Sequence, residues 1–155
     1  MRKILIVLAL FAILLTAISC QRETTSNVSV DAIWEKMRET AAFSQPSEEN
    51  LLDCEIAEKF GISLESIKDG KVFYDRNPIN ADKVIIIKAN GDSSVEKIER
   101  ALSSEKIRLV DALENDSNQQ KKANNIITKT IGYYCLLIIS GNASELEKIF
   151  DKAVR

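Results

Sequence analysis

The sequence has no histidine among its 155 residues, and this absence removes much of the usual chemistry of enzymes. Histidine is the side chain that most often acts as a general base near neutral pH, binds metals, and activates serine or cysteine nucleophiles. The three cysteines form no Cys-x-x-Cys motif, so the sequence offers no zinc or redox site. We therefore expect no metal and no cofactor, and we expect that the protein is not an enzyme.

An excess of charge of one sign is also missing. The chain has 21 Lys and Arg against 23 Asp and Glu, a net charge of −2. It contains no cluster of basic residues of the kind that binds phosphates, so nucleic acid is not an expected partner. Hydrophobic residues make up 45% and charged residues 28% of the chain. This balance is typical of one globular domain.

An unbroken apolar run of a length typical of an export signal occurs only at the N-terminus. Arg2 and Lys3 precede 12 apolar residues, 4–15. A membrane-spanning helix needs about 20 apolar residues, so this run has the shape of an export signal. The stretch that follows, "TAISC", resembles the lipobox of bacterial lipoprotein signal peptides, in which small residues precede an obligatory cysteine.

The resemblance implies that the signal is cut between Ser19 and Cys20, and that the Cys20 thiol carries a diacylglyceryl anchor. Residues 1–19 would be the signal peptide, 20–29 the lipidated cysteine and a flexible polar tether, and 30–155 a single domain. This domain would lie at the extracytoplasmic face of the cell membrane. Two alternatives stay open, an ordinary cleavage site formed by Ala17 and Ser19 and an uncleaved anchor.

Apolar spacing and turn residues predict the secondary structure of the domain in the order ααββαββα. We expect helices at 30–41, 48–60 and 94–114, a closing helix that is capped at Asn142 and runs to 154, and strands at 71–75, 83–89, 125–131 and 133–139. Ser29 or Asp31 can cap the first helix, and Ser93 with Glu96 can cap the long one. The short connections within each strand pair favour antiparallel pairing. The prediction is an α+β fold with a four-stranded, mostly antiparallel sheet and helices packed on one face.

Three segments carry a resemblance to a known family: "EIAEKFGISLESIKDGKV", "NADKVIIIKA" before a long charged helix, and "GYYCLLIIS" before the last helix. Together they resemble the domain-of-unknown-function 4358 family of bacterial lipoproteins, typical of clostridial Gram-positive bacteria. The resemblance covers nearly all of 30–154. The family has no established activity, so the resemblance implies a location and a fold rather than a function.

One loop is a candidate partner site. Asp75, Asn77, Asn80 and Asp82 surround a proline in "YDRNPINAD", and they could bind a cation or a partner, although turn formation explains the same residues. The acidic stretch at 48–58 lacks the alternating ligands and glycine turn of a calcium loop. For Cys54 and Cys135 we favour two free, buried thiols that alkylate slowly until the protein unfolds, over a disulfide.

The sequence therefore predicts a lipid-anchored extracytoplasmic domain with a non-catalytic binding or envelope-associated role. Its expected partners are the membrane, through Cys20, and a membrane or envelope protein. A ligand-binding accessory subunit of a membrane complex is one alternative. A carboxylate-based hydrolase is the enzyme that the composition disfavours least.

Overall fold

The computed structural model describes residues 27–77 and 79–155. The predicted signal peptide (1–19), the predicted cleavage site at Ser19 and Cys20, and the predicted tether as far as residue 26 lie outside the described residues. The elements, in chain order, are α2 (Val30–Ala41), β1 (Pro46–Asn50), α3 (Cys54–Lys59), the 3-10 helix η2 (Leu64–Ser66), β2 (Ile67–Asp75), β3 (Lys83–Ala89), α4 (Asp92–Leu113), α5 (Gln120–Ala123), β4 (Ile127–Ile131), β5 (Tyr134–Ile139) and α6 (Ala143–Val154).

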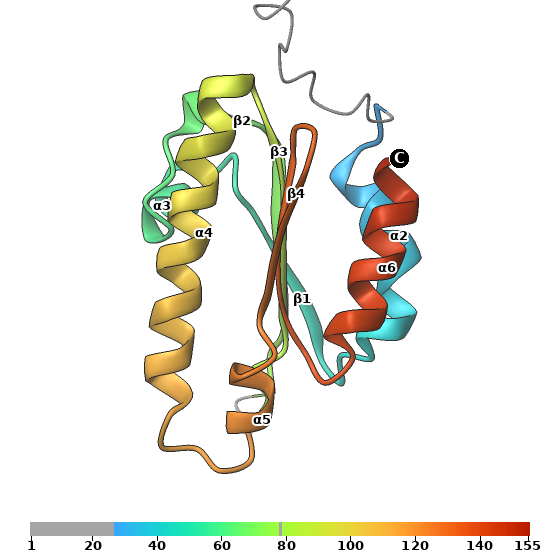
Figure 1. Cartoon of the computed structure of the whole chain (residues 1–155), viewed down its shortest axis with the longest axis vertical. Helices are drawn as coiled ribbons and strands as arrows, with labels where there is room; N and C mark the ends of the chain where they lie inside the picture. The colour runs from blue at the N-terminus through green and yellow to red at the C-terminus, as the bar shows by residue number, and fades with distance from the viewer. Residues whose placement is uncertain (1–26, 78) are drawn as a thin grey trace, which may run out of the picture.

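A five-stranded antiparallel sheet forms the centre of the domain, in the strand order β1-β2-β3-β5-β4. Helices α2 and α6 lie side by side on one face, and α4 covers the other (Figure 1). The α+β class is as predicted. The prediction of four strands with helices on one face is wrong, because the sheet has a fifth strand and is covered on both faces.

The second layer of helices follows from the composition of the two central strands. Along β3, Val84 and Ile86 are buried against α2 and α6, whereas Ile85 and Ile87 are buried against α4. All six residues of β5 are buried as well. A strand that is covered on both faces is apolar throughout, whereas a strand with one wet face alternates. The unbroken runs "VIII" and "YCLLII" therefore require two helical layers.

The fifth strand is β1, where the sequence analysis expected the start of a helix. Its residues "PSEEN" pair with the end of β2, from Pro46 opposite Asp75 to Asn50 opposite Lys71. The Lys71 ammonium also binds the Glu48 carboxylate at 2.9 Å. The acids that suggested a helix start are thus on a half-exposed edge strand, which partners distant in sequence hold in place.

Helix ends differ from the prediction at one point and agree at another. Ser29 caps α2, because its Oγ accepts a hydrogen bond from the Ala32 amide at 3.2 Å. In α4 the N-cap is Gly91, without a side-chain cap, so the predicted pair of Ser93 and Glu96 does not cap this helix. Within 27–77 and 79–155, every helix is too short or too polar to cross a bilayer.

Candidate functional site

The predicted partner loop is organised around a buried carboxylate. Asp75 Oδ2 accepts hydrogen bonds from the Ser44 amide (2.7 Å), the Ser44 hydroxyl (2.9 Å) and Asn80 Nδ2 (3.0 Å). Its Oδ1 accepts from the amides of Gln45 (3.0 Å) and Asn77 (2.9 Å). Burial raises the pKa of Asp75, but these hydrogen bonds outweigh it and hold the pKa well below its usual range. Asp75 therefore fastens the start of β1 to the end of β2.

The other members of this loop also bond within the chain. The Asp82 carboxylate binds Lys122 Nζ at 2.7 Å, and Asn77 Oδ1 accepts from the Ile79 amide at 3.2 Å. The structure thus brings Asp75, Asn77 and Asn80 together, and Asp82 reaches them through its backbone carbonyl, which accepts from the Asp75 amide at 3.1 Å. These contacts give the loop a structural role, and its role toward a partner stays a prediction.

Residues 27–30 are bound to one end of the sheet by a group that we call the N-terminal clasp: Lys88, Tyr134 and Asp69. The buried Tyr134 hydroxyl accepts from the Val28 amide at 2.9 Å and donates to the Val28 carbonyl at 2.6 Å. Lys88 Nζ donates to Asn27 Oδ1 and lies 4.9 Å from the centre of the Tyr134 ring.

The third member of the clasp holds the first turn of α2. Asp69 Oδ2 accepts a hydrogen bond from the Val30 amide at 2.9 Å. That amide is one of the four at a helix start that have no partner within the helix. The chain therefore enters the domain at a defined point, at the end of the sheet that carries the β4–β5 turn (Figure 1).

The outer edge of β4 has backbone groups that no neighbouring strand covers. The Tyr133 carbonyl accepts a hydrogen bond from the Ala89 amide at 2.8 Å. The backbone amides and carbonyls of odd-numbered β5 residues therefore point to β3, and those of even-numbered residues point to β4. The backbone groups of Thr128 and Thr130 consequently point away from the sheet. Among the described residues, no hydrogen bond to these amides or carbonyls is present.

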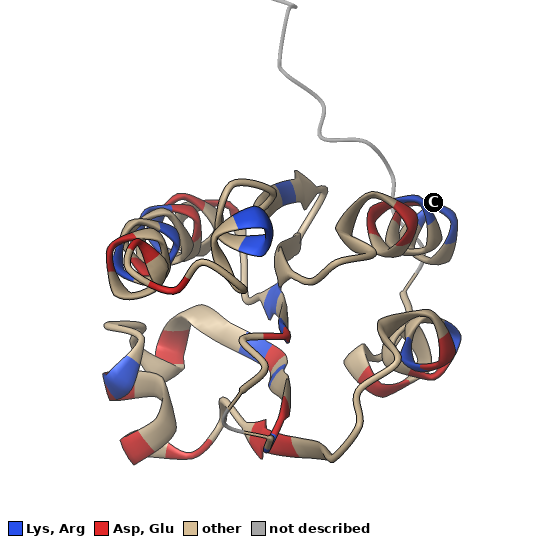
Figure 2. Cartoon of the chain, turned by 90° about the horizontal axis from the view of Figure 1, so that it is seen from below, with Lys and Arg blue, Asp and Glu red and all other residues tan. Residues whose placement is uncertain are grey.

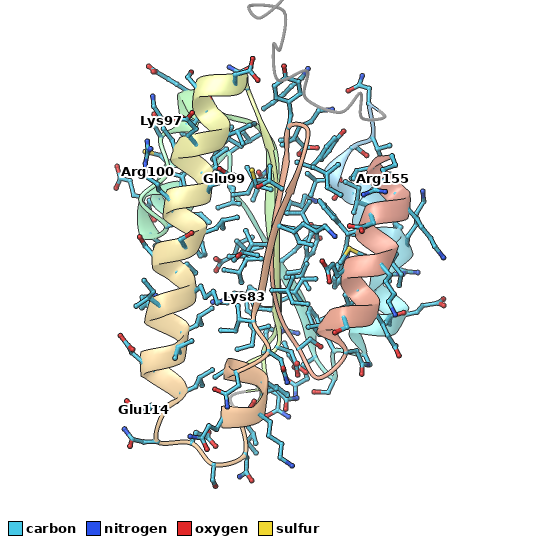
Figure 3. The ribbon with its side chains drawn as sticks, in the orientation of Figure 1. Lys83, Lys97, Glu99, Arg100, Glu114 and Arg155 are labelled. Carbon is cyan, nitrogen blue, oxygen red and sulfur yellow. The ribbon has the colours of Figure 1, made fainter. Side chains whose placement is uncertain are left out.

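A hollow of about 290 Å³ lies beside this edge, and we call it the β4 groove. It is lined by Glu99, Leu102 and Ser103 of α4, by Thr128, Lys129 and Thr130 of β4, and by Leu136. Figure 3 shows Glu99 on the side of α4 that is turned to the β4–β5 hairpin, with Lys97 and Arg100 on the opposite side. Sequence analysis missed this site, although the β-branched pattern "ITKTI" was a signal for a strand prone to pairing.

Two other hollows lie elsewhere on the domain. One of about 250 Å³ is lined by Lys68, Lys88 and Tyr133, and one of about 220 Å³ lies at the start of α6. Within the described part of the chain, no three His, Cys, Asp or Glu side chains gather in a way that could hold a metal ion. Basic and acidic residues interleave around the helices seen in Figure 2, so this view shows no face of one charge.

Cys54 and Cys135 form no disulfide, and the two thiols differ in exposure. Cys135 is buried in β5, as predicted, whereas Cys54 is exposed, so the prediction of burial is wrong for Cys54. Cys54 Sγ donates to Glu58 Oε1 at 3.6 Å, and this hydrogen bond, with the charge of Glu58, raises the pKa of the thiol.

Comparison with known proteins gives one match. Residues 42–140 match the family described as "Domain of unknown function (DUF4358)". No curated protein and no solved structure matches the chain. The matched region runs from the end of α2 to the end of β5, and so includes all five strands.

Proposed function

The chain belongs to the family described as Domain of unknown function (DUF4358), and from that premise we propose that it is a lipid-anchored, extracytoplasmic binding module without catalytic activity. The N-terminal clasp is the observation that carries this proposal. A tethered domain needs a defined attachment point if the tether is to control which surface it presents. The clasp provides one, because Lys88 binds Asn27 and Tyr134 binds Val28.

The covalent distance from the predicted anchor to the clasp is short. Seven residue steps separate Cys20 from Asn27, and an extended chain covers at most about 25 Å in seven steps. A lipid on Cys20 would therefore keep the clasp close to the bilayer. Helix α4 has 22 residues and a length of about 33 Å, so α5, at the opposite end of the domain in Figure 1, would lie further from the membrane.

The pairing of the buried acids favours binding over catalysis. A carboxylate-based hydrolase needs two carboxyl groups that face each other across a cleft. The buried Glu105 instead contacts Lys83 Nζ at 3.3 Å and Arg108 Nε at 2.7 Å. Such pairs occupy the carboxylate oxygens that would act on a substrate.

The test is phase partition of the full-length protein expressed in bacteria, with the mass of its mature N-terminus. The wild type should enter the detergent phase and carry a diacylglyceryl group on Cys20. Cys20→Ala should lose this mass and stay in the aqueous phase or keep its signal segment. Cys54→Ala is the matched control and should behave as the wild type, because Cys54 lies within the folded domain. An unmodified mature protein that begins at another residue would refute the anchor.

A further inference from the structure

We propose that the outer edge of β4 and the β4 groove form a docking site for an extended segment of a partner protein. The segment would add to the sheet as a sixth strand and place a lysine or arginine side chain against Glu99. This inference deepens the binding role proposed above by naming the surface and the chemistry of the partner.

The outward amides and carbonyls of β4 match the backbone of another extended chain. Thr128 and Thr130 together present two amides and two carbonyls outward, at the spacing of alternate residues in a strand. Water satisfies such groups in an isolated domain, and another extended chain satisfies all of them at once. Addition of a strand to a sheet edge is a known mode of peptide recognition, in which backbone bonds give affinity and side-chain pockets give specificity.

The groove lies where alternate side chains of an added strand would point. Side chains of a strand alternate between the two faces of the sheet, so every second residue of the segment would face α4. There it would meet Glu99, Leu102 and Ser103 across a hollow of about 290 Å³. Specific sites for small ligands begin at about this size, so the groove suits one or two side chains better than a cofactor.

Charge selects a basic side chain. Glu99 is exposed, and within the described residues its carboxylate has no ion-pair partner. The one lysine of β4, Lys129, is committed to the opposite face, where its ammonium lies 2.8 Å from both Glu147 and Asp151 of α6. A lysine or arginine of the segment could lay its methylene groups along the exposed Ser103 and its charge beside Glu99.

A second copy of the chain fits this site less well. Outward groups of β4 can pair only with outward groups, so a β4–β4 contact would place Thr128 and Thr130 opposite the same residues of the other copy. Residues directly opposite each other lie on the same face of a sheet. The groove would then receive threonine, which offers no charge to Glu99.

The probe is a pool of seven-residue peptides with Lys at the centre and Thr, Val or Ile elsewhere, tested on the full-length protein in detergent micelles. The matched pool has Glu at the centre. We expect the Lys pool to bind about three- to fivefold more tightly, as a partly exposed ion pair gives, and to slow hydrogen exchange at the amides of Thr128 and Thr130. Glu99→Arg should reverse the preference between the pools.

Proline variants test the backbone contact. Thr130→Pro removes an outward amide and keeps the backbone hydrogen bonds to β5, since proline is tolerated at such edge positions. It also removes the 3.8 Å hydrogen bond from Thr130 Oγ1 to Cys135 Sγ, so Thr130→Val, which keeps the amide, is the control for that contact. Thr130→Pro should weaken binding about tenfold or more, whereas Glu48→Pro on β1 should leave binding unchanged. A thermal midpoint near that of the wild type shows that each variant folds. If Thr130→Pro does not fold, the reversal of preference expected for Glu99→Arg still tests the proposal.

Two results would overturn the proposal. One is the absence of protection at Thr128 and Thr130 at millimolar concentrations of the Lys pool. The other is a doubling of the protein mass in light scattering that Thr130→Pro abolishes, since the edge would then be an interface between two copies. Neither measurement involves lipid on Cys20, so failure of the docking site and failure of the anchor are separate outcomes.

Discussion

The two edges of the sheet differ in how far their backbone is closed. On β1, the Gln45 carbonyl accepts from the Arg76 amide and the Leu51 amide donates to the Gly70 carbonyl, so the even-numbered residues point outward. These are Pro46, which has no amide hydrogen, Glu48, which is charged, and Asn50, whose carbonyl already accepts from Asp53 at 3.1 Å. On β4 the outward residues are two threonines.

The difference shows that each edge strand depends on its own residues to prevent pairing with another chain. Proline and charge are the usual means by which proteins prevent strands from pairing at an edge, and β1 uses both. An edge of β-branched residues with free backbone groups has the opposite character, since it invites another strand. In one small sheet, therefore, one edge carries a proline and an outward charged residue that disfavour pairing, and the other presents outward threonines that favour it.

Of the substitutions that test the difference between the two edges, Asp75→Ala should change the free energy of unfolding most, because it removes the hydrogen bonds that hold the start of β1. The substitution leaves the amides of Ser44, Gln45 and Asn77 without their acceptor, and we expect a loss of about 3 kcal/mol in the free energy of unfolding. Denaturant titration measures it. Glu48→Ala on the same edge is the control and should cost less than about 1 kcal/mol.

The Asp75 contribution also has a defined pH dependence. Because its pKa is lowered in the folded state, the stabilisation is complete above the unfolded pKa of about 3.9 and is lost as the pH falls below it toward the folded pKa. The difference between wild type and Asp75→Ala should therefore shrink in acid. A difference that stays constant down to pH 2 would contradict this account.

A smaller effect is expected at the clasp, which lies at neither edge. Tyr134→Phe removes both hydrogen bonds to Val28 and should cost about 1–2 kcal/mol, with faster hydrogen exchange at the Val28 amide. Tyr74→Phe, which loses only a 3.5 Å contact with Glu49, serves as the control. Unchanged exchange at Val28 in Tyr134→Phe would show that the hydroxyl does not hold the segment.

Lys129→Met should lower the free energy of unfolding by about 1 kcal/mol, because it leaves the carboxylates of Glu147 and Asp151 facing each other on α6 without the lysine between them. Hydrogen bonds to Asp151 and Glu147 raise the pKa of Lys129 in the folded protein. The stabilisation is thus complete below the unfolded pKa of about 10.4 and is lost as the pH rises through the folded value. Equal stability of the two proteins at pH 7 would refute a fastening role for this pair.

The smallest expected effect is on the alkylation rates of the two thiols, one near each edge of the sheet. Cys54, just after β1, should react with iodoacetamide in the native protein, whereas Cys135, beside β4, should react only after unfolding. Glu58→Gln should speed the reaction of Cys54 roughly twofold near pH 8, because Glu58 no longer raises its pKa. Peptide mapping assigns each adduct, and rapid native labelling of Cys135 would mean that the β4 edge opens.

How much of this could be predicted from sequence depends on whether a feature is local. The first helix, the long helix and the apolar central strands have strong local patterns, and each was predicted within a few residues of its range. The two helical layers also had a local signal, since an unbroken run such as "VIII" already implies burial on both faces.

The errors involve partners that are distant along the chain. The strand β1 has no apolar alternation, and its position depends on Asp75, which lies 30 residues beyond Gln45. The β4 groove depends on strand order, which places β4 at an edge and next to α4. In sequence, Glu99 is one of many charged residues on an exposed helix face, and only its place beside a free edge distinguishes it.

The clasp has a mechanical consequence. It joins the N-terminal segment to Tyr134 at the start of β5, and β5 is the strand that pairs with β4 along its full length. A tension applied between the anchor and a segment bound at β4 would enter the sheet through Tyr134 of β5, Lys88 of β3 and Asp69 of β2. The part of the pull that runs from Tyr134 to β4 would lie roughly along the strands, so it would shear the β4–β5 hydrogen bonds together rather than open them one after another, and β1 and α4 would carry little of the load.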